Sequence, residues 1–299
     1  MLTAYLAPKD FINELKFELK NIQAIYDRLI LCEGPTQATS WAQHIWFDCQ
    51  IAQIESINEA ANILKQNAKI WCNYSFSHHR RAQLIQDKLI KIKEKKYELL
   101  SPLPPSEISA WCLIDNNQIL YSVKTNSNLP LGEIHFLEDK NNPPSRAYLK
   151  LWDFFTNEKQ FPKKGQKVVD FGSCPGGWTW VLQGLGCEVI SIDRSPLAPQ
   201  IAKLPNIQFI QRNAFTLKPQ DLGPIDWFFS DIICYPEKLY ELINEWRESG
   251  LCKNFVCTIK FQGPTDFKAT EKFRLIPGAK VQHLFHNKHE LTFSLIENP

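Results

Sequence analysis

The segment that most restricts how this chain can fold runs from Val168 to Thr179 and reads VVDFGSCPGGWT. A short apolar run ends in Gly172, and a stretch that suits a helix begins at Gly177. Glycines let the backbone turn tightly and let other groups approach it closely. A helix that starts directly after such a turn presents free N–H groups to an anionic ligand. The sequence therefore predicts a strand, a glycine-rich turn and a helix.

The chain after Pro144 continues this alternation of strands and helices. We predict strands at residues 167–171, 188–192, 207–210, 227–230 and 254–259, helices at 177–184 and 236–248, and a closing strand–turn–strand at 279–285 and 290–296. Alternating strands and helices favour an α/β fold with a mostly parallel sheet. A C-terminal antiparallel hairpin added to that sheet predicts the class I (Rossmann-like) methyltransferase fold for residues 144–299.

The first hundred residues are expected to form a smaller α/β domain that ends before the proline-rich stretch 101–106, because prolines interrupt regular structure. Within it, we predict a long basic helix over residues 80–99. Residues 101–143 are interpreted as a linker that carries a hairpin over 111–124, turning at Asp115-Asn116-Asn117.

Charge and cysteine content exclude several classes of protein. Lys and Arg number 34 against 32 Asp and Glu, and this net charge of +2 argues against a uniformly polyanion-binding surface. The 9 cysteines include no C-x-x-C pair, which argues against a zinc ribbon or a dithiol redox site. Neither a secretory signal nor an 18-residue apolar run is visible. We therefore expect a cytoplasmic protein with reduced cysteines, no membrane association and no metal.

The glycine turn is a poor match to the G-x-G-x-x-G dinucleotide pattern. Two polar residues at the ends of later strands instead stand at positions suited to a nucleoside. Asp193 ends the next predicted strand, where an acid binds a ribose diol in such folds. Asn213 follows the third strand and is placed to hydrogen-bond an adenine edge. Alternatively, each is a solvated residue at a strand end.

The segment DFGSCPGGWT, residues 170–179, resembles the S-adenosylmethionine motif of the FtsJ-like RNA ribose 2′-O-methyltransferases. PSRAYLKL, residues 144–151, is similar to the S-R-A-x-x-K-L signature of that family. The layout is closest to the RlmM type, which methylates a cytidine of 23S rRNA and carries a THUMP-like RNA-binding region before the catalytic domain. The catalytic resemblance covers residues 143–298, and for residues 1–100 it is one of layout.

This resemblance implies S-adenosylmethionine as the cofactor, with Asn213 standing where the family commonly has aspartate. The implied cofactor-binding residues are Asp170, Gly172, Ser173, Cys174, Pro175, Gly176, Gly177, Trp178, Asp193, Asn213 and Asp231.

The family also uses a Lys-Asp-Lys-Glu tetrad, which maps onto Lys150, Asp231, Lys260 and Glu290. A ribose hydroxyl needs a base to become a nucleophile, and a lysine can serve if burial and cationic neighbours lower its pKa. Our hypothesis is that Lys260 is the base, that Asp231 orients it, and that Lys150 with Glu290 positions the 2′-hydroxyl. No metal is required.

Between residues 80 and 96, 7 basic residues stand against Asp87 and Glu94. Such a stripe suits the phosphates of RNA, and the alternative is a solvated helix face. The predicted RNA contacts are Arg80, Arg81, Lys88, Lys91, Lys95 and Arg146. His283, His286 and His289 are spaced H-x-x-H-x-x-H, but this spacing does not align side chains on a strand, and we predict no metal site there.

The sequence thus predicts an S-adenosylmethionine-dependent RNA ribose 2′-O-methyltransferase that acts on 23S rRNA, with no obligate protein partner evident. One alternative is a methyltransferase of the same fold that acts on a small molecule or a protein. Another is an RNA-binding protein that keeps the fold without catalysis. The tetrad argues against the first alternative, and the intact cofactor positions argue against the second.

Overall fold

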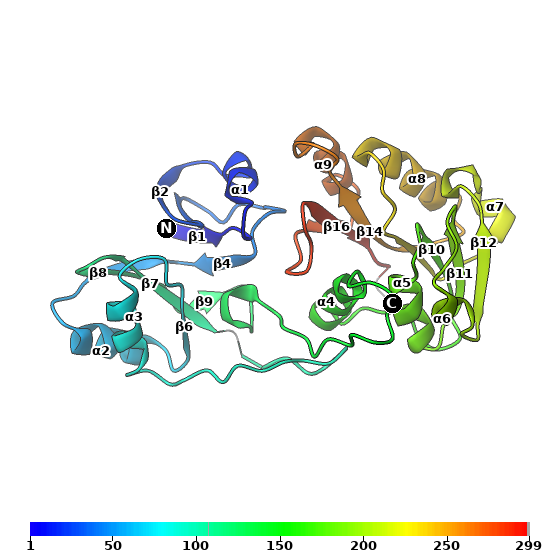
Figure 1. Ribbon diagram of the computed structural model, residues 1–299. Helices are drawn as coiled ribbons and strands as arrows, with labels where there is room; N and C mark the ends of the chain where they lie inside the picture. The colour runs from blue at the N-terminus through cyan, green and yellow to red at the C-terminus, as the bar shows by residue number, and fades with distance from the viewer. Residues whose placement is uncertain (107, 298–299) are drawn as a thin grey trace. The chain divides into compact units, whose positions relative to one another are not determined.

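The computed structural model describes residues 1–106 and 108–297, and the chain divides into two compact units. Unit 1 comprises Met1–Tyr97 and Ser101–His135, and unit 2 comprises Glu98–Leu100 and the chain from Phe136 onward. The last two residues of the predicted domain 144–299 lie outside the described residues. Unit 1 contains two sheets and unit 2 contains one (Figure 1).

Unit 1 begins with an antiparallel sheet of strand order β2-β3-β1-β4-β9. Its elements are β1 (Leu2–Leu6), α1 (Ile12–Glu18), β2 (Ile22–Tyr26), β3 (Leu29–Glu33), β4 (His44–Phe47) and β9 (Lys124–Thr125). A second sheet has the order β5-β8-β7-β6, with only β6 and β7 parallel. Its elements, with the helices beside them, are β5 (Gln50–Gln53), α2 (Ile57–Asn67), β6 (Trp71–Asn73), α3 (His79–Gln86), β7 (Ser109–Asp115), β8 (Gln118–Ser122) and the 3₁₀ turn η1 (Pro130–Gly132).

The hairpin that we predicted in a linker is the middle of this second sheet. β7 pairs with β6 and β8 pairs with β5, so both strands complete a sheet begun by the first hundred residues. Trp111 of β7 packs in one core with Leu64 of α2 and Ile85 of α3. The structure therefore assigns residues 101–135 to unit 1, because pairing across the sheet continues past the proline-rich stretch.

The predicted long basic helix over residues 80–99 is wrong. α3 ends at Gln86, and the chain then runs without regular structure to Tyr97, whose N–H donates to the carbonyl of His135 at 2.8 Å. A helix would have set Lys91 and Lys95 one turn apart, and like charges at that spacing are destabilising. An extended path separates them and lets Tyr97 pair with a distant strand-like segment.

Unit 2 is built on a seven-stranded sheet of order β12-β11-β10-β13-β14-β16-β15. Its strands are β10 (Lys167–Phe171), β11 (Glu188–Asp193), β12 (Ile207–Gln211), β13 (Trp227–Ser230), β14 (Asn254–Lys260), β15 (Lys280–Gln282) and β16 (Glu290–Leu295). The strands β10 to β14 are parallel, and β16 lies antiparallel between β14 and β15. The predicted class I fold, with its mostly parallel sheet and antiparallel C-terminal hairpin, is confirmed.

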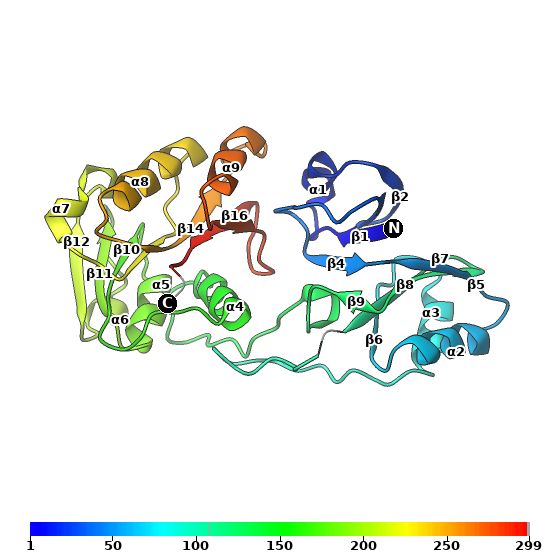
Figure 2. The same ribbon diagram turned by 180° about the vertical axis from the view of Figure 1, so that it is seen from behind.

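Helices cover both faces of this sheet (Figures 1 and 2). They are α4 (Tyr148–Glu158), α5 (Gly177–Gly184), α6 (Pro199–Ala202), α7 (Pro219–Leu222), α8 (Pro236–Glu248) and α9 (Phe267–Arg274), with the 3₁₀ turn η2 (Ala214–Thr216). Phe228 and Phe229 are neighbours in β13 and so point to opposite faces. Phe228 contacts Trp246 of α8, whereas Phe229 contacts Phe155 of α4. Both faces are therefore apolar, as a buried parallel sheet requires.

Candidate active site

The glycine-rich turn after β10 has a backbone that only glycine adopts without strain. Gly172 has φ +77° and Gly176 has φ +114°. A Cβ at Gly172 would lie 2.6 Å from the Cα of Ile232, and one at Gly176 would lie 2.9 Å from the side chain of Ile201. The turn leads directly into α5, whose first N–H groups have no partner within the helix. This arrangement is a ready site for an anionic or polar ligand.

Two buried polar atoms beside the turn are available to a ligand. Among the described residues, Oδ1 of Asp170 and Oγ of Ser173 are buried without a hydrogen-bond partner. The other carboxylate oxygen of Asp170 accepts from Oγ1 of Thr179 at 2.7 Å, and Thr179 lies 2.7 Å from Oγ of Ser191. Orphaned buried polar groups are costly, so they indicate a place where a further group binds. Burial raises the pKa of Asp170 to about 7.

Asp170 is expected to make the stability of unit 2 fall as the pH rises. An unfolded aspartate ionises near pH 4, so between pH 4 and 7 the folded protein holds a proton that the unfolded chain has lost. The free energy of unfolding then decreases with pH by at most about 1.4 kcal/mol per unit. Asp170→Asn should remove this slope and make the variant more stable than the wild type at pH 8. Urea unfolding at several pH values measures it.

The matched control is Asp226→Asn, which changes an exposed aspartate just before β13 and should keep the slope of the wild type. Equal slopes in the wild type and Asp170→Asn would contradict the assignment of the raised pKa.

The structure places Asp193 beside the glycine turn. Asp193 ends β11, and its carboxylate accepts from the N–H of Cys174 at 3.0 Å and from the N–H of Ser195 at 2.9 Å. Both oxygens keep further acceptor capacity, which suits the two hydroxyls of a ribose. Asn213 caps η2 by accepting from the N–H of Phe215 at 3.2 Å, so its Oδ1 is already engaged once, and its amide N–H groups are the side-chain donors that it can offer a ligand.

The other residues of the turn differ in how far they are exposed to solvent. Pro175 is exposed and Cys174 is half-buried, whereas Gly176 and Gly177 are buried. The side chain of Trp178 is buried, and its indole N–H donates to the carbonyl of Ala147 at 3.0 Å. Trp178 therefore joins α5 to the residues before α4, and only its backbone N–H remains for a ligand.

Four charged side chains from separate elements meet at one point. Lys150 of α4 lies 3.0 Å from Oδ1 of Asp231 and 2.7 Å from Oε1 of Glu290. Lys260, the last residue of β14, lies 3.1 Å from the same Oδ1 and also donates to the backbone carbonyl of Asp231. The four residues predicted from the sequence are thus in contact, and all are largely shielded from water.

The sheet explains why these residues meet. Asp231 follows β13 and Lys260 ends β14, and the C-terminal ends of neighbouring parallel strands lie at the same edge. Glu290 begins β16, which runs antiparallel to β14 in a register that pairs Lys260 directly with Glu290. Directly paired residues place their side chains on the same face of the sheet.

Lys150 and Lys260 differ in the charged groups that surround them. Burial lowers the pKa of Lys150, but the carboxylates of Asp231 and Glu290 outweigh this effect and hold it above its usual value. Burial raises the pKa of Asp231, but Lys150 and Lys260 outweigh burial and the net pKa is lowered. Lys150 is therefore a fixed cation between two carboxylates, whereas the one carboxylate paired with Lys260 within the described residues is that of Asp231.

One member of the site was missed in the sequence. Thr258 is buried, and its hydroxyl donates to Oδ1 of Asp231 at 2.5 Å. It precedes Lys260 by two residues in β14 and so shares its face of the sheet. Strand periodicity back from Lys260 would have identified it.

The three histidines of the H-x-x-H-x-x-H pattern lie beside different groups. His283 lies 3.0 Å from the carbonyl of Lys288, His286 lies 3.0 Å from Asp153, and His289 lies 2.8 Å from Oγ1 of Thr265. Each ring thus has a different partner. Within residues 1–106 and 108–297, no cluster of His, Cys, Asp or Glu is placed to hold a metal ion.

The basic residues predicted to contact RNA lie on α3, on the irregular segment after it, and in unit 2. Arg80 is exposed on α3, whereas Arg81 is half-buried with two guanidinium nitrogens enclosed. Lys88, Lys91 and Lys95 are exposed on the irregular segment after α3. In unit 2, Arg146 is exposed and pairs with Glu138 at 2.8 Å.

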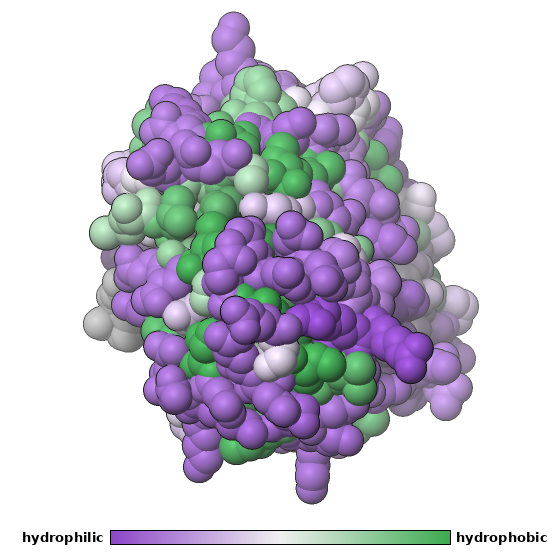
Figure 3. All heavy atoms as spheres, turned by 90° about the vertical axis from the view of Figure 1, so that its left-hand side faces the viewer, coloured by the Kyte–Doolittle hydropathy of each residue, from purple (hydrophilic) through white to green (hydrophobic). Residues whose placement is uncertain are grey.

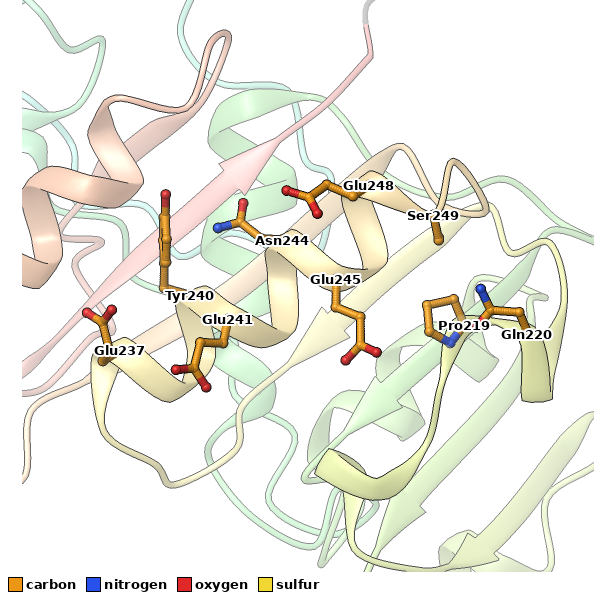
Figure 4. Close-up of a pocket in the computed structure, with 9 residues that line it drawn as sticks. All are labelled: Pro219, Gln220, Glu237, Tyr240, Glu241, Asn244, Glu245, Glu248 and Ser249. Carbon is orange, nitrogen blue, oxygen red and sulfur yellow. The ribbon is translucent and has the colours of Figure 1, made fainter.

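A pocket of about 580 Å³ in unit 2 lies away from this chemistry. It is bordered by α7 and α8, and Figure 4 shows four glutamates of α8 along it: Glu237, Glu241, Glu245 and Glu248. No residue of the tetrad or of the glycine turn lines it. Lysines pair with three of these glutamates, at Lys272–Glu237, Lys238–Glu241 and Lys218–Glu245. This acidic face is unsuited to a polyanion.

In the described part of the chain, no helix combines the length and the apolar character that crossing a membrane requires. All 9 cysteines are free thiols, and 8 of them are buried.

Comparison with known proteins shows what this chain is similar to. Residues 143–275 match the FtsJ-like methyltransferase family. "Ribosomal RNA large subunit methyltransferase M" of Thauera aminoaromatica is 28% identical over 182 residues, which are 56% of this chain and 49% of that protein. The protein of the same description from Pseudomonas fluorescens (strain SBW25) is 28% identical over 244 residues, 75% of this chain and 64% of its own. The chain spans about half the length of the curated relatives that it matches.

Among solved structures, TrmN from Thermus thermophilus aligns with 99% of this chain and 99% of its own at 13% identity and a TM-score of 0.39. A likeness at that level supports no conclusion about function.

Proposed function

Because residues 143–275 match the FtsJ-like methyltransferase family, we propose that this chain is an S-adenosylmethionine-dependent RNA ribose 2′-O-methyltransferase that acts on a cytidine of 23S rRNA. The observation that carries the proposal is the meeting of Lys150, Asp231, Lys260 and Glu290 beside a glycine-rich turn. The relatives described as large subunit ribosomal RNA methyltransferases support rRNA as the substrate class. Cytidine as the target follows from the resemblance to the RlmM type.

The residues of the turn fit the proposed cofactor. Gly172 and Gly176 leave the backbone open to close approach, and Asp193 presents acceptors for a ribose diol. The unpartnered oxygens of Asp170 and Ser173 can accept from the cofactor's hydrogen-bond donors or face its positive charge. When bound, S-adenosylmethionine supplies a methyl group on a sulfonium, which is already a strong electrophile.

The tetrad supplies what a ribose 2′-hydroxyl lacks. A hydroxyl must lose its proton as its oxygen attacks the methyl carbon, and we assign the acceptance of that proton to Nζ of Lys260. Asp231 fixes this amine through its carboxylate and its backbone carbonyl. Lys150, held by Asp231 and Glu290, positions the hydroxyl by donating to its oxygen. Correct placement of the reacting atoms accounts for a large part of the rate in such displacements.

Lys260 suits the role of base better than Lys150. Lys150 has a carboxylate on each side, and these favour its charged form. Lys260 shares Asp231 with Lys150 and has Glu290 paired to the other lysine. A cationic ligand close to a lysine disfavours its charged form and so makes the neutral amine more available.

Labelled methyl transfer separates this proposal from its competitors. The protein is incubated with methyl-labelled S-adenosylmethionine and total rRNA from cells that lack it, and the modified nucleotide is then mapped. A 2′-O-methylcytidine in 23S rRNA is the expected result. Label in small molecules or proteins, with none in RNA, would favour the first alternative, and tight RNA binding without transfer would favour the second.

We also propose that unit 1, expected from its layout to be THUMP-like, binds RNA through a basic groove. A groove of about 570 Å³ lies where α2 ends and the segment after α3 begins, and Lys65, Lys69 and Lys88 line it. Within the described residues none of these three ammonium groups pairs with a carboxylate, and all three lysines are exposed. The face of the molecule in Figure 3 is largely hydrophilic, with several hydrophobic patches between the hydrophilic residues. Unpaired cations around a hollow favour a phosphate backbone.

Replacing Lys65, Lys69 and Lys88 together with alanine should raise the Kd for rRNA roughly tenfold at physiological salt. The plot of the logarithm of the RNA association constant against the logarithm of the salt concentration should become less steep by about 2. Each phosphate contact contributes roughly 0.7–0.9 to the steepness of that plot. Filter binding at several salt concentrations measures both. S-adenosylmethionine binding should not change.

The control carries the same change in net charge. In it, Lys218, Lys238 and Lys272 become alanine, and each of them is already paired with a glutamate on the acidic face of α8. Equal loss of RNA affinity in both triple variants would show that net charge, rather than the groove, determines binding.

A further inference from the structure

A buried carboxylate outside the tetrad lies beside the loop that leads to Glu290. This carboxylate belongs to Asp153 of α4, which is 1% exposed. The loop is residues 283–289, which join β15 to β16, and Glu290 is the first residue of β16. The proposed catalytic chemistry does not use Asp153, yet burying an ionisable group is costly unless it is well bonded.

Asp153 is bonded at both oxygens. Its Oδ2 accepts from the backbone N–H of His286 at 3.0 Å and lies 3.0 Å from Nδ1 of the same histidine. Its Oδ1 accepts from the amide of Asn157 at 2.7 Å. The ring of His286 also packs on Phe136, with centroids 5.3 Å apart. His286 is therefore held to α4 through its backbone, its ring nitrogen and its ring face.

The loop itself is internally braced. His283 lies 3.0 Å from the carbonyl of Lys288, and Asn287 accepts from the N–H of Leu284 at 3.0 Å. The N–H of Lys288 donates to Oε1 of Glu290 at 3.3 Å. A braced loop moves as one piece, so a contact at His286 also fixes the start of β16.

The other end of this connection is the helix that carries Lys150. Asp153 follows Lys150 by three residues in α4, a spacing that puts two side chains on adjoining parts of one helix face. Lys150 in turn contacts Glu290 at 2.7 Å. Helix and loop are thus joined twice, once through the tetrad and once through Asp153 and His286.

We propose that Asp153 and His286 are positioning residues that fix Glu290 against Lys150. The pair acts through the loop and does not touch the substrate. The inference rests on the proposed function for its catalytic consequence, whereas its structural part concerns the chain alone. It also gives the H-x-x-H-x-x-H pattern a role: His283 braces the loop and His286 fastens it to α4.

The test compares three variants of the full chain in methyl transfer and in hydrogen–deuterium exchange. His286→Ala removes the ring contact and should lower kcat roughly tenfold to a hundredfold, with the KM for S-adenosylmethionine unchanged. Exchange at residues 286–292 should become faster. His286→Asn keeps an N–H that can reach Asp153, and it should restore kcat to within about threefold of the wild type.

Glu158→Gln is the matched control, because it weakens a different link between α4 and β15. Glu158 accepts from Lys280 at 2.6 Å and from Gln282 at 2.9 Å, and both of these residues belong to β15 rather than to the loop. This variant should lose comparable thermal stability yet keep kcat and the exchange of residues 286–292. If His286→Ala leaves exchange at Glu290 unchanged, the positioning role is overturned whatever the activity.

The two failures are distinguishable. A wild-type protein that transfers no methyl group to rRNA, combined with faster exchange in His286→Ala, would overturn the proposed function and retain the structural link. Faster exchange with wild-type kcat, or an equal loss of kcat in Glu158→Gln, would overturn the catalytic part of the inference.

Discussion

Replacing Lys260 with alanine should lower methyl transfer by roughly 10²–10⁴-fold, the usual contribution of a general base. Binding of S-adenosylmethionine should stay at the wild-type level, because Lys260 contacts Asp231 and not the glycine turn. Single-turnover transfer to rRNA and calorimetric cofactor titration measure the two quantities separately. A Lys260→Ala protein that binds cofactor normally and retains full transfer would rule out Lys260 as the base.

The same strand provides the control. Lys253 immediately precedes β14, at the opposite end from Lys260, and pairs with Glu297 at 2.9 Å in an exposed position. Lys253→Ala removes the same charge and the same side chain, and it should leave transfer unchanged. A loss in both variants would indicate that the strand, rather than the amine of Lys260, had been disturbed.

Lys150→Ala should also reduce transfer, but through a different route. It leaves Asp231 with Lys260 and removes the lysine partner of Glu290, and breaking a largely buried pair at one side is commonly costly. The two lysines share one carboxylate, so their effects should be less than additive in the double variant. This coupling explains why the assignment of the base rests on Lys260→Ala with its cofactor control.

The parts of the fold that local signals determine could be predicted from the sequence. The strand 167–171 and the helices 177–184 and 236–248 lie where they were predicted, because Gly172 and Gly177 mark the turn between the strand and the first helix and Pro236 marks the start of the second helix. The ends of parallel strands fall at one edge by topology, which is why Asp231 and Lys260 could be expected to meet.

The parts of the fold and of the site that were not predicted depend on contacts between residues far apart in the sequence. The hydrogen bond between Tyr97 and His135 holds the segment after α3 in an extended path. No feature of the sequence near residue 90 predicts this bond. The contact of Glu290 with Lys150 depends on the register that pairs Lys260 with Glu290, which the sequence cannot show. The family resemblance predicted Glu290 as a member of the tetrad, whereas only the structure shows the contact between Asp153 and His286.

Gly172 connects the glycine-rich turn with the residues that hold the tetrad. It has φ +77°, and its α-carbon faces the backbone of Ile232, the residue directly after Asp231. A methyl group there would lie 2.6 Å from the Cα of Ile232, and a backbone atom cannot move aside as a flexible side chain does. An alanine at this position therefore displaces either the glycine turn or the residues that hold Asp231.

Gly172→Ala should accordingly weaken S-adenosylmethionine binding roughly a hundredfold, since a left-handed alanine alone costs about 1–2 kcal/mol and the contact with Ile232 adds to it. Methyl transfer should fall with it even at saturating cofactor, because Asp231 moves. Gly184→Ala is the control: it lies in α5 with open space around it and should bind cofactor normally. Thermal unfolding of both variants separates loss of the site from loss of the fold. A folded Gly172→Ala protein with wild-type affinity for S-adenosylmethionine would refute the view that this turn forms the cofactor site.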